Sequence, residues 1–146
     1  MRLTRIVAPS GPVVTLAEAK AHLRVDHDDD DGHITGCVLA AEGHLDGPFG
    51  TLGRCLVDQT WQASLAEGEA FRQPLIDARD EVRDDLARTV TFTAGFGGPE
   101  DVPWAIKAAI LLHVGTLYQH RETQASSVAP TGAYEALLAP WRAWGG

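Results

Sequence analysis

TVTFTAGFGGPEDVPWAIKAAILLHVGTLYQHRE, residues 89–122, is the stretch around which the rest of the chain is expected to fold. Apolar and hydroxyl side chains alternate over residues 90–94, which is the pattern of a half-buried strand. Three glycines then end the strand. Asp101 is a suitable N-cap for a following helix, and Pro103 fits its first turn, where a missing N–H leaves no hydrogen bond unmade. The stretch therefore predicts a strand, a glycine turn and a long helix.

The predicted helix is apolar around most of its circumference, because alanines and leucines widen the stripe formed by its larger side chains. Such a helix is either central to a core or packed between chains. We therefore expect it to be the central helix of the fold and a candidate for packing between subunits. The candidate packing residues are Trp104, Ile106, Ile110, His113 and Leu117.

Length and composition indicate one globular domain. The chain has 146 residues, 45% hydrophobic and 22% charged, which is enough to bury a core without metal or disulfide support. Its longest strongly apolar run, residues 108–114, is far shorter than the roughly 20 residues that span a bilayer. The first residues lack the apolar segment of a signal peptide. We expect no membrane contact, a cytoplasmic origin, and buried thiols at Cys37 and Cys55.

The charge balance argues against direct recognition of nucleic acid. The formal net charge is −8 at neutral pH, and the twelve Lys and Arg residues form no basic cluster. Tight binding to DNA or RNA normally needs such a cluster to displace counterions. An acidic protein can still work beside nucleic acid, because like charge keeps its surface from adhering.

The first half of the chain predicts two short helices joined by an acidic turn. Residues 1–14 contain several breakers and are expected to be extended or loose. Thr15 and Glu18 form a capping box that starts a helix ending near Val25. After the aspartate-rich run 26–32, a second helix is expected at about residues 33–46. Its two glycines each weaken it by roughly 1 kcal/mol, so it either contacts another backbone closely or is held by its neighbours.

The second half predicts strands and a tail. Residues 55–65 alternate as a strand with one wet face. For residues 68–88 a short amphipathic helix is favoured over a surface excursion between strands, because opposite charges recur three and four residues apart. Residues 123–132 are expected to form a loop. A final helical element, residues 133–144, carries two tryptophans, which either contact a partner or fold back on their own domain.

Together these patterns predict a mainly α (α+β) fold. We expect a small helical bundle around the long central helix, with a small antiparallel β insertion at about residues 55–95. Residues 1–132 would form the main domain, and residues 133–146 a C-terminal helical tail.

No catalytic or metal-binding motif is complete. A calcium loop starting at His27 has histidine at its first position and Val38 at its twelfth, where oxygen ligands are required. His113 and His120 are seven residues apart, too far along a helix to share one tetrahedral ion. The glycine turn lacks the lysine of a phosphate loop. We therefore predict a protein that is not an enzyme and binds no cofactor or metal.

Four segments in order resemble the head–tail connector (adaptor) proteins of tailed phages, including the equivalent neck adaptors of gene transfer agents. They are residues 14–26 with the acidic turn, Gln59-Thr60-Trp61, residues 90–97 with Val102-Pro103 and the helix ending in Arg121-Glu122, and residues 137–144. Trp141 stands where the family commonly has tyrosine. The segment between the first strand and residue 90 is shorter here than in the family.

The resemblance implies a subunit that assembles as a ring, usually of twelve copies, in the neck of a virion or phage-like particle assembled in the bacterial cytoplasm. The ring would lie between the portal protein and the stopper (head-completion) protein and leave a channel for DNA without binding it specifically. An alternative is a small helical homodimeric regulatory or interaction protein, and a hydrolase using the acidic run ranks behind it. The portal-docking residues implied by the resemblance are Tyr134, Leu137, Leu138, Trp141, Arg142 and Trp144.

Overall fold

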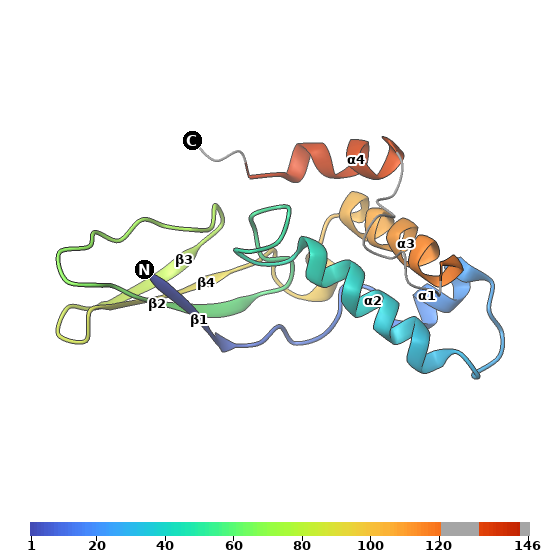
Figure 1. The fold of residues 1–146 in the computed structure, drawn as a ribbon, viewed down its shortest axis with the longest axis horizontal. Helices are drawn as coiled ribbons and strands as arrows, with labels where there is room; N and C mark the ends of the chain where they lie inside the picture. The colour runs from blue at the N-terminus through green and yellow to red at the C-terminus, as the bar shows by residue number, and fades with distance from the viewer. Residues whose placement is uncertain (121–131, 144–146) are drawn as a thin grey trace.

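The fold has a helical half and a sheet half, which lie at opposite ends of an elongated molecule (Figure 1). The structure is a computed structural model and describes residues 1–120 and 132–143. Its described strands are β1 (Arg2–Val7), β2 (Gln59–Ser64), β3 (Arg79–Asp84) and β4 (Thr89–Ala94). Its described helices are α1 (Leu16–Leu23), α2 (Asp31–Leu45), α3 (Trp104–Gln119) and α4 (Gly132–Leu138), with the 3-10 turns η1 (Pro99–Asp101) and η2 (Ala139–Trp141).

The sheet has four antiparallel strands in the order β1-β2-β4-β3. Arg5, Trp61 and Phe92 are register partners across three of them. The face that carries Trp61 and Phe92 is buried, and the segment between β2 and β3 covers it with Phe71 and Leu75. The opposite face carries hydroxyl and amide side chains and is half-exposed, as the alternation in β2 and β4 predicts.

The predicted fold class, a bundle around a long central helix with a small β insertion, is wrong. The sheet is a four-stranded half of the molecule with its own core, and its first strand comes from the N-terminal segment expected to be extended or loose. The protein is therefore an α+β protein, with its helices in one half and a four-stranded antiparallel sheet in the other.

β1 and β3 were not predicted because side-chain burial does not hold them in place. All six residues of β3 and five of the six in β1 are exposed, so neither strand shows a periodic apolar pattern. Backbone pairing with β2 and β4 holds them instead. The charge pattern of residues 68–88 that favoured a helix suits an exposed edge strand equally well, and the expected helix is wrong.

The helical half largely follows the sequence pattern. At the start of α1, Thr15 Oγ1 accepts a hydrogen bond from the Glu18 N–H at 3.1 Å, which confirms the capping box. Asp101, predicted to cap α3, instead accepts the Gly98 N–H at 2.8 Å and closes η1, while Pro103 occupies the N-cap. α3 contacts α1, α2 and α4. No described helix combines the length and apolar character required to cross a bilayer.

A polar junction joins the two halves. Asp46, directly after α2, accepts the Leu56 N–H at 2.7 Å and the Gln59 amide at 3.0 and 2.8 Å through its two oxygens. Gln59 opens β2 and is 1% exposed. The carboxylate therefore fixes the end of a helix to the start of the sheet.

Candidate functional site

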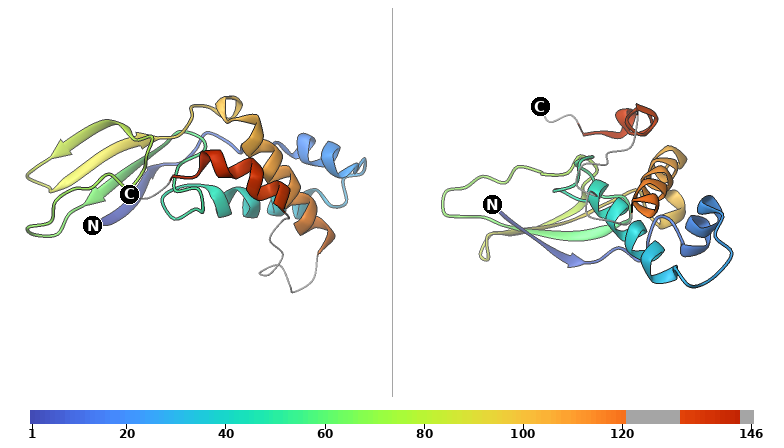
Figure 2. Two further views of the ribbon diagram at one scale, coloured as in Figure 1. Left: turned by 90° about the horizontal axis from the view of Figure 1, so that it is seen from above. Right: turned by 45° about the vertical axis from the view of Figure 1, so that its right-hand side comes forward.

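The predicted docking tail lies across the helical half. α4 packs over α3, and the chain then turns back toward the sheet (Figures 1 and 2). Tyr134 and Leu138 point inward and are 2% and 0% exposed. α4 ends at Leu138, short of the expected helix over residues 133–144, because Pro140 lacks an N–H and clashes with the preceding turn of a helix.

An aromatic stack seats the tail on α3. The Tyr134 ring meets the His113 ring edge to face at 5.6 Å between centroids, and His113 meets His44 of α2 in the same way at 5.6 Å. Burial, and secondarily the neighbouring His44, lowers the pKa of His113, whereas burial raises the pKa of Tyr134 to about 12. Both rings are therefore neutral at neutral pH, so the contact between Tyr134 and His113 involves no charged ring.

Beyond α4 the tail is fixed at two more points. The Trp141 ring packs edge-on against Phe96 at 5.8 Å, and the Arg54 guanidinium lies over Phe96 at 5.2 Å. The Ala143 N–H donates to the Leu52 carbonyl at 2.9 Å. The described tail is therefore bound to its own chain from α4 to residue 143.

The predicted docking residues divide into two groups. Tyr134 and Leu138 belong to the core of the helical half. Leu137, Trp141 and Arg142 are partly exposed, with Arg142 paired to Glu135, and Trp144 lies outside the described residues. Two of the six predicted side chains therefore face the core. In the described tail, Leu137, Trp141 and Arg142 are the predicted residues that a partner could contact.

The predicted packing residues on α3 divide in the same way. Ile106 and Ile110 are fully buried, and His113 is 9% exposed. Leu117 is partly buried against the same core. Trp104 is 70% exposed at the start of α3, and its ring lies 5.9 Å from the Lys107 ammonium. Of the predicted set, Trp104 is the most exposed side chain.

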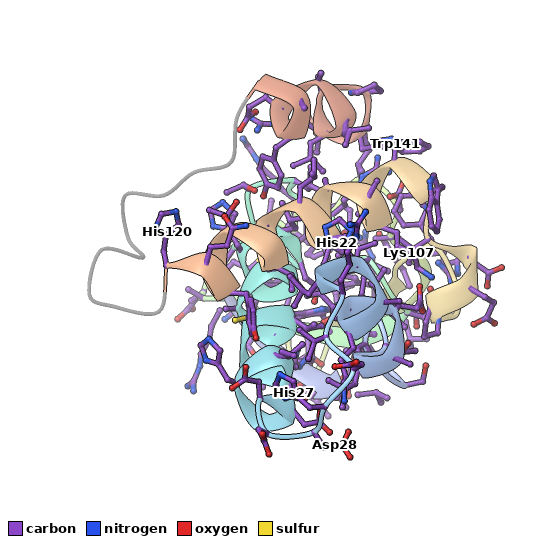
Figure 3. All side chains as sticks on the ribbon, turned by 90° about the vertical axis from the view of Figure 1, so that its right-hand side faces the viewer. His22, His27, Asp28, Lys107, His120 and Trp141 are labelled. Atoms are coloured by element: carbon purple, nitrogen blue, oxygen red, sulfur yellow. The ribbon has the colours of Figure 1, made fainter. Side chains whose placement is uncertain are left out.

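The acidic run between α1 and α2 serves as a link within the chain. Lys20 pairs with Asp28 and with Asp31, each at 2.7 Å, and Asp30 accepts a hydrogen bond from the Tyr118 hydroxyl at 2.5 Å. Figure 3 shows Asp28 at the tip of this turn, below the helices. The pKa of Lys20 is raised, first by its bond to Asp28 and then by its bond to Asp31. Within the described ranges, no three His, Cys, Asp or Glu side chains are placed to hold a metal ion.

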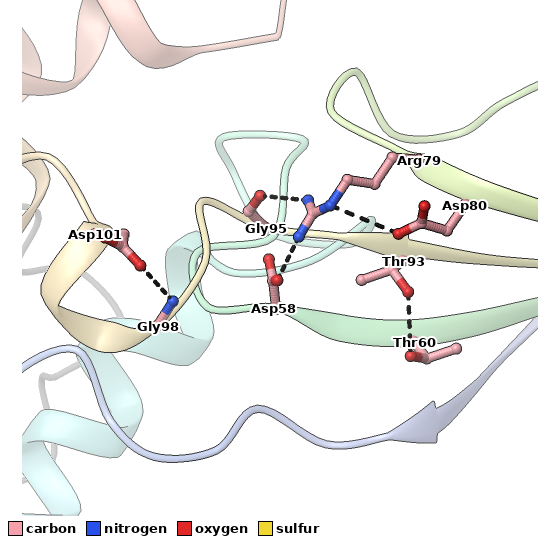
Figure 4. A network of polar contacts seen from close by, with 8 residues as sticks. All are labelled: Asp58, Thr60, Arg79, Asp80, Thr93, Gly95, Gly98 and Asp101. Atoms are coloured by element: carbon pink, nitrogen blue, oxygen red, sulfur yellow. Dashed lines mark hydrogen bonds and ion pairs between the residues drawn. The ribbon is translucent and has the colours of Figure 1, made fainter.

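The glycine turn before α3 is occupied by partners from the chain itself (Figure 4). Arg79 of β3 donates to the Gly95 carbonyl at 3.0 Å and pairs with Asp58. The Asp58 N–H in turn donates to the Gly97 carbonyl at 2.8 Å. This network ties β3, β4 and the start of β2 together, so the turn has a structural role and not that of a phosphate loop.

The two thiols are buried and form no disulfide, as predicted. Burial raises the pKa of Cys55 to about 12, with a smaller contribution from the nearby Asp46 carboxylate. The thiol is therefore protonated at neutral pH, and a protonated buried thiol is a poor nucleophile.

The two outer edges of the sheet expose backbone hydrogen-bonding groups that the sequence pattern did not predict. β1 and β3 lie at the two outer edges, and each carries an exposed valine, Val7 at 54% and Val82 at 67%. The β-branched residues Thr4, Ile6 and Val7 were the available signal for β1. Apolar and polar residues do not alternate in this segment, so the pattern did not predict a strand.

Comparison with solved structures relates this fold to gene transfer agent (GTA) particles. One similar chain comes from the neck of an empty GTA particle computed with C6 symmetry, with 20% identity, a TM-score of 0.67 and coverage of 100% of this chain and 99% of that chain. Another comes from the virion of a native GTA particle, with 19% identity, a TM-score of 0.62 and the same coverage. No protein-family model matches the sequence, and no curated protein does.

The similarity extends over the whole chain, helical half and sheet half together. It includes β1 and β3, the two strands that the sequence pattern did not predict. The resemblance of the sequence to the neck proteins of phage-like particles is thus confirmed at the level of the fold: this chain has the fold of a GTA neck protein.

Proposed function

We propose that this protein is a structural subunit of the neck of a phage or phage-like particle. Several copies would assemble as a ring between the portal protein and the stopper, with twelve copies implied by the resemblance to the connector family, and DNA would pass through the central channel. The observation that carries this proposal is the end-to-end match with a chain of the GTA neck. The match extends over both halves of the molecule and leaves almost no part of either chain uncovered.

The internal partners of the candidate reactive groups support a structural role over an enzymatic one. The acidic run, the glycine turn and the Cys55 thiol each have internal partners or a raised pKa, as described above. These groups hold elements together, and they do not face a common cleft with an acid, a base and a nucleophile in reach of one another. The protein would serve as a structural part of the particle neck, and the particle would be assembled in the bacterial cytoplasm.

Residues 1–132 would form the connector domain and residues 133–146 the segment that docks on the portal. Tyr134 and Leu138 are buried in the core and would set the position of the tail. Leu137, Trp141 and Arg142 are partly exposed and would contact the portal, together with Trp144. Aromatic and arginine side chains are the usual anchors of such interfaces.

On α3, Trp104 would be the contact with a neighbouring molecule. It is 70% exposed, whereas Ile106, Ile110 and His113 pack inside the chain. An exposed tryptophan beside a lysine has the apolar area and the polar rim of an interface anchor. Replacing it leaves the core untouched, so its effect on assembly is separable from folding.

The net charge suits a channel lining. A charge of −8 per copy, repeated around a ring, gives an acidic collar that repels DNA phosphates and lets the duplex slide. Fluorescence anisotropy with a labelled duplex at physiological salt should therefore show no binding. Saturable binding under these conditions would contradict a non-adhesive channel.

The ring is tested by mixing the full chain with portal rings of the same particle and recording native mass spectra and electron micrographs. We expect a discrete ring on the portal. Monomer alone at micromolar concentration would overturn the proposal, and a closed dimer would favour the homodimeric regulatory protein instead.

Two point variants locate the contacts within that assay. Trp104→Ala should raise the concentration needed for ring assembly by roughly tenfold or more, as expected for a hot-spot tryptophan. Arg142→Glu should weaken attachment to the portal while free subunits stay folded. Unchanged circular dichroism and melting temperature are the control for both variants, since both side chains are at least partly exposed.

A further inference from the structure

The sheet ends in two outer edges that have no strand beside them in the described chain. β1 pairs with β2 alone and β3 with β4 alone. An outer edge presents a row of backbone N–H and C=O groups, which either needs protection or accepts another strand. The side chains on each edge strand indicate which kind of strand could pair with it.

The two edges carry opposite charge. β1 contains Arg2 and Arg5, both exposed, and no acidic residue. Residues 79–85, which comprise β3 and the residue after it, contain four carboxylates and two guanidinium groups. Arg79 pairs with Asp58 and Asp80, and Arg83 pairs with Glu81, so residues 79–85 keep a net excess of two negative charges. One outer edge of the sheet, β1, is therefore basic, and the opposite outer edge, β3, is acidic.

Both edges also expose a valine on the same face of the sheet. Val7 is the register partner of Thr60, and Val82 is the register partner of Thr91. Thr60 and Thr93 bring their hydroxyls within 3.4 Å of each other, and Thr91 lies two residues from Thr93, so this is one face. If the sheet continued from one molecule into the next, both valines would lie on a single continuous face.

Strand direction fits a continuation from one edge to the opposite one. Because all three pairings are antiparallel, β1 and β3 run in opposite directions. A second copy placed beside the first in the same orientation therefore sets its β1 antiparallel to the first copy's β3. Antiparallel pairing is the more stable kind per residue.

We propose that β1 of one copy adds to β3 of the next, which joins subunits head to tail through a continuous antiparallel sheet. This rests on the ring of the proposed function and names the contact that builds it. Two unlike surfaces in contact generate a ring when the rotation closes, whereas pairing β1 with β1 closes a dimer. Pairing like edges would also place arginines opposite arginines, which is unfavourable.

The contact is short and geometrically compatible with a wide ring. Irregularities between Arg5 and Val7 and between Arg79 and Val82 confine regular pairing to a few residues on each strand. Four strands advance a sheet by roughly 19 Å, so twelve copies give a circumference of roughly 230 Å before strand tilt widens it.

Charge reversal with rescue tests the contact in the full chain mixed with portal rings. Arg2→Glu/Arg5→Glu should raise the concentration for half-maximal assembly by roughly tenfold, equivalent to about 1.4 kcal/mol. Adding Asp80→Lys/Asp85→Lys as a second population should restore mixed rings. Arg24→Glu, a charge reversal of the same kind at an exposed residue after α1 in the helical half, is the control and should assemble as the wild type does.

The outcomes separate this contact from the ring itself. Normal rings from Arg2→Glu/Arg5→Glu, or no rescue by the lysine variant, overturn the edge contact and leave the ring standing. A wild type that stays monomeric on portal rings overturns both.

A cross-link distinguishes opposite-edge from like-edge pairing. Val7→Cys protein and Val82→Cys protein are each treated with a short bismaleimide, alone and as a mixture, with the portal present. Covalent dimers only in the mixture support the contact of β1 with β3. Dimers from Val7→Cys alone, or from neither sample, contradict it.

Discussion

Single residues decide where the backbone can turn, and Gly95 is the clearest case. Its φ is +142°, in the region that favours glycine, and a Cβ there would lie 2.5 Å from the Asp58 nitrogen. A side chain at Gly95 would therefore strain the backbone. It would also push the end of β4 away from Asp58, which leads into β2 (Figure 4). Gly36, in the exposed middle of α2, is the opposite case, because a Cβ there would meet nothing within 4 Å in the described chain.

These two glycines give a paired prediction for stability. Gly95→Ala should lower the free energy of unfolding by about 3 kcal/mol, from backbone strain and the steric clash combined. Gly36→Ala should raise it by about 1 kcal/mol, because alanine is the better helix former and no contact opposes it. Urea unfolding of both variants measures the difference. A stable Gly95→Ala variant would show that the turn relaxes freely.

His113 predicts a pH-dependent seat for the tail. Its folded-state pKa lies below the ordinary value of 6.5, so between the two values the unfolded chain binds more protons than the folded one. The stability it contributes is thus complete above pH 6.5 and falls as pH drops toward the folded pKa. His113 packs between His44 and Tyr134, and the carboxylate of Glu135 acts on the Tyr134 hydroxyl.

The measurement compares wild type with His113→Phe, which keeps the ring and removes the titration. Between pH 7.5 and pH 5.5 the wild type should lose stability relative to the variant in chemical unfolding. Parallel pH profiles for the two proteins would show that His113 does not titrate across this range.

At the scale of elements, the tail depends on its contact with α3. Leu138 is 0% exposed in the core of the helical half. Leu138→Ala should lower the free energy of unfolding by about 2–5 kcal/mol, because it removes a buried side chain and leaves a cavity. Hydrogen exchange should show α4 opening first. Leu86→Ala, at a leucine that is 98% exposed, is the matched control and should change stability by less than about 0.5 kcal/mol.

The link between helix and sheet makes a prediction at the same scale. Asp46→Ala would leave the Leu56 N–H and the buried Gln59 amide without their acceptor. We expect a loss of about 2–4 kcal/mol, since each buried donor left unsatisfied costs roughly 1–3 kcal/mol. Asp46→Asn retains one acceptor oxygen and should lose about half as much. Equal stability of all three proteins would mean that water replaces the carboxylate.

Elements with a local signal were the ones that the sequence predicted. The capping box at Thr15 depends on neighbours three residues apart, and the alternation in β2 reports burial of one face by Trp61. β1 and β3 carry no such signal, because their partners are distant in sequence and their side chains stay in solvent. The inward seat of Tyr134 depends likewise on His113, which lies outside any local window.

At the scale of the whole molecule, the candidate contacts are distributed over both halves. Trp104 and the tail belong to the helical half, while the charged edges belong to the sheet half. The resemblance to the connector family indicated the tail as a contact, because the residues of the tail lie close together in the sequence. It did not point to the edges, because strand order is a property of the folded sheet and not of any one segment.

Strand order also bears on how the protein is made. β1 is synthesised first, but β2 follows only after both α1 and α2 have been synthesised. At roughly 5–20 residues per second, β1 waits several seconds on the ribosome before its partner exists. During that interval a strand bearing exposed Ile6 and Val7 has no neighbour of its own chain to pair with. We therefore expect nascent chains of this protein to bind a chaperone until β2 emerges from the ribosome.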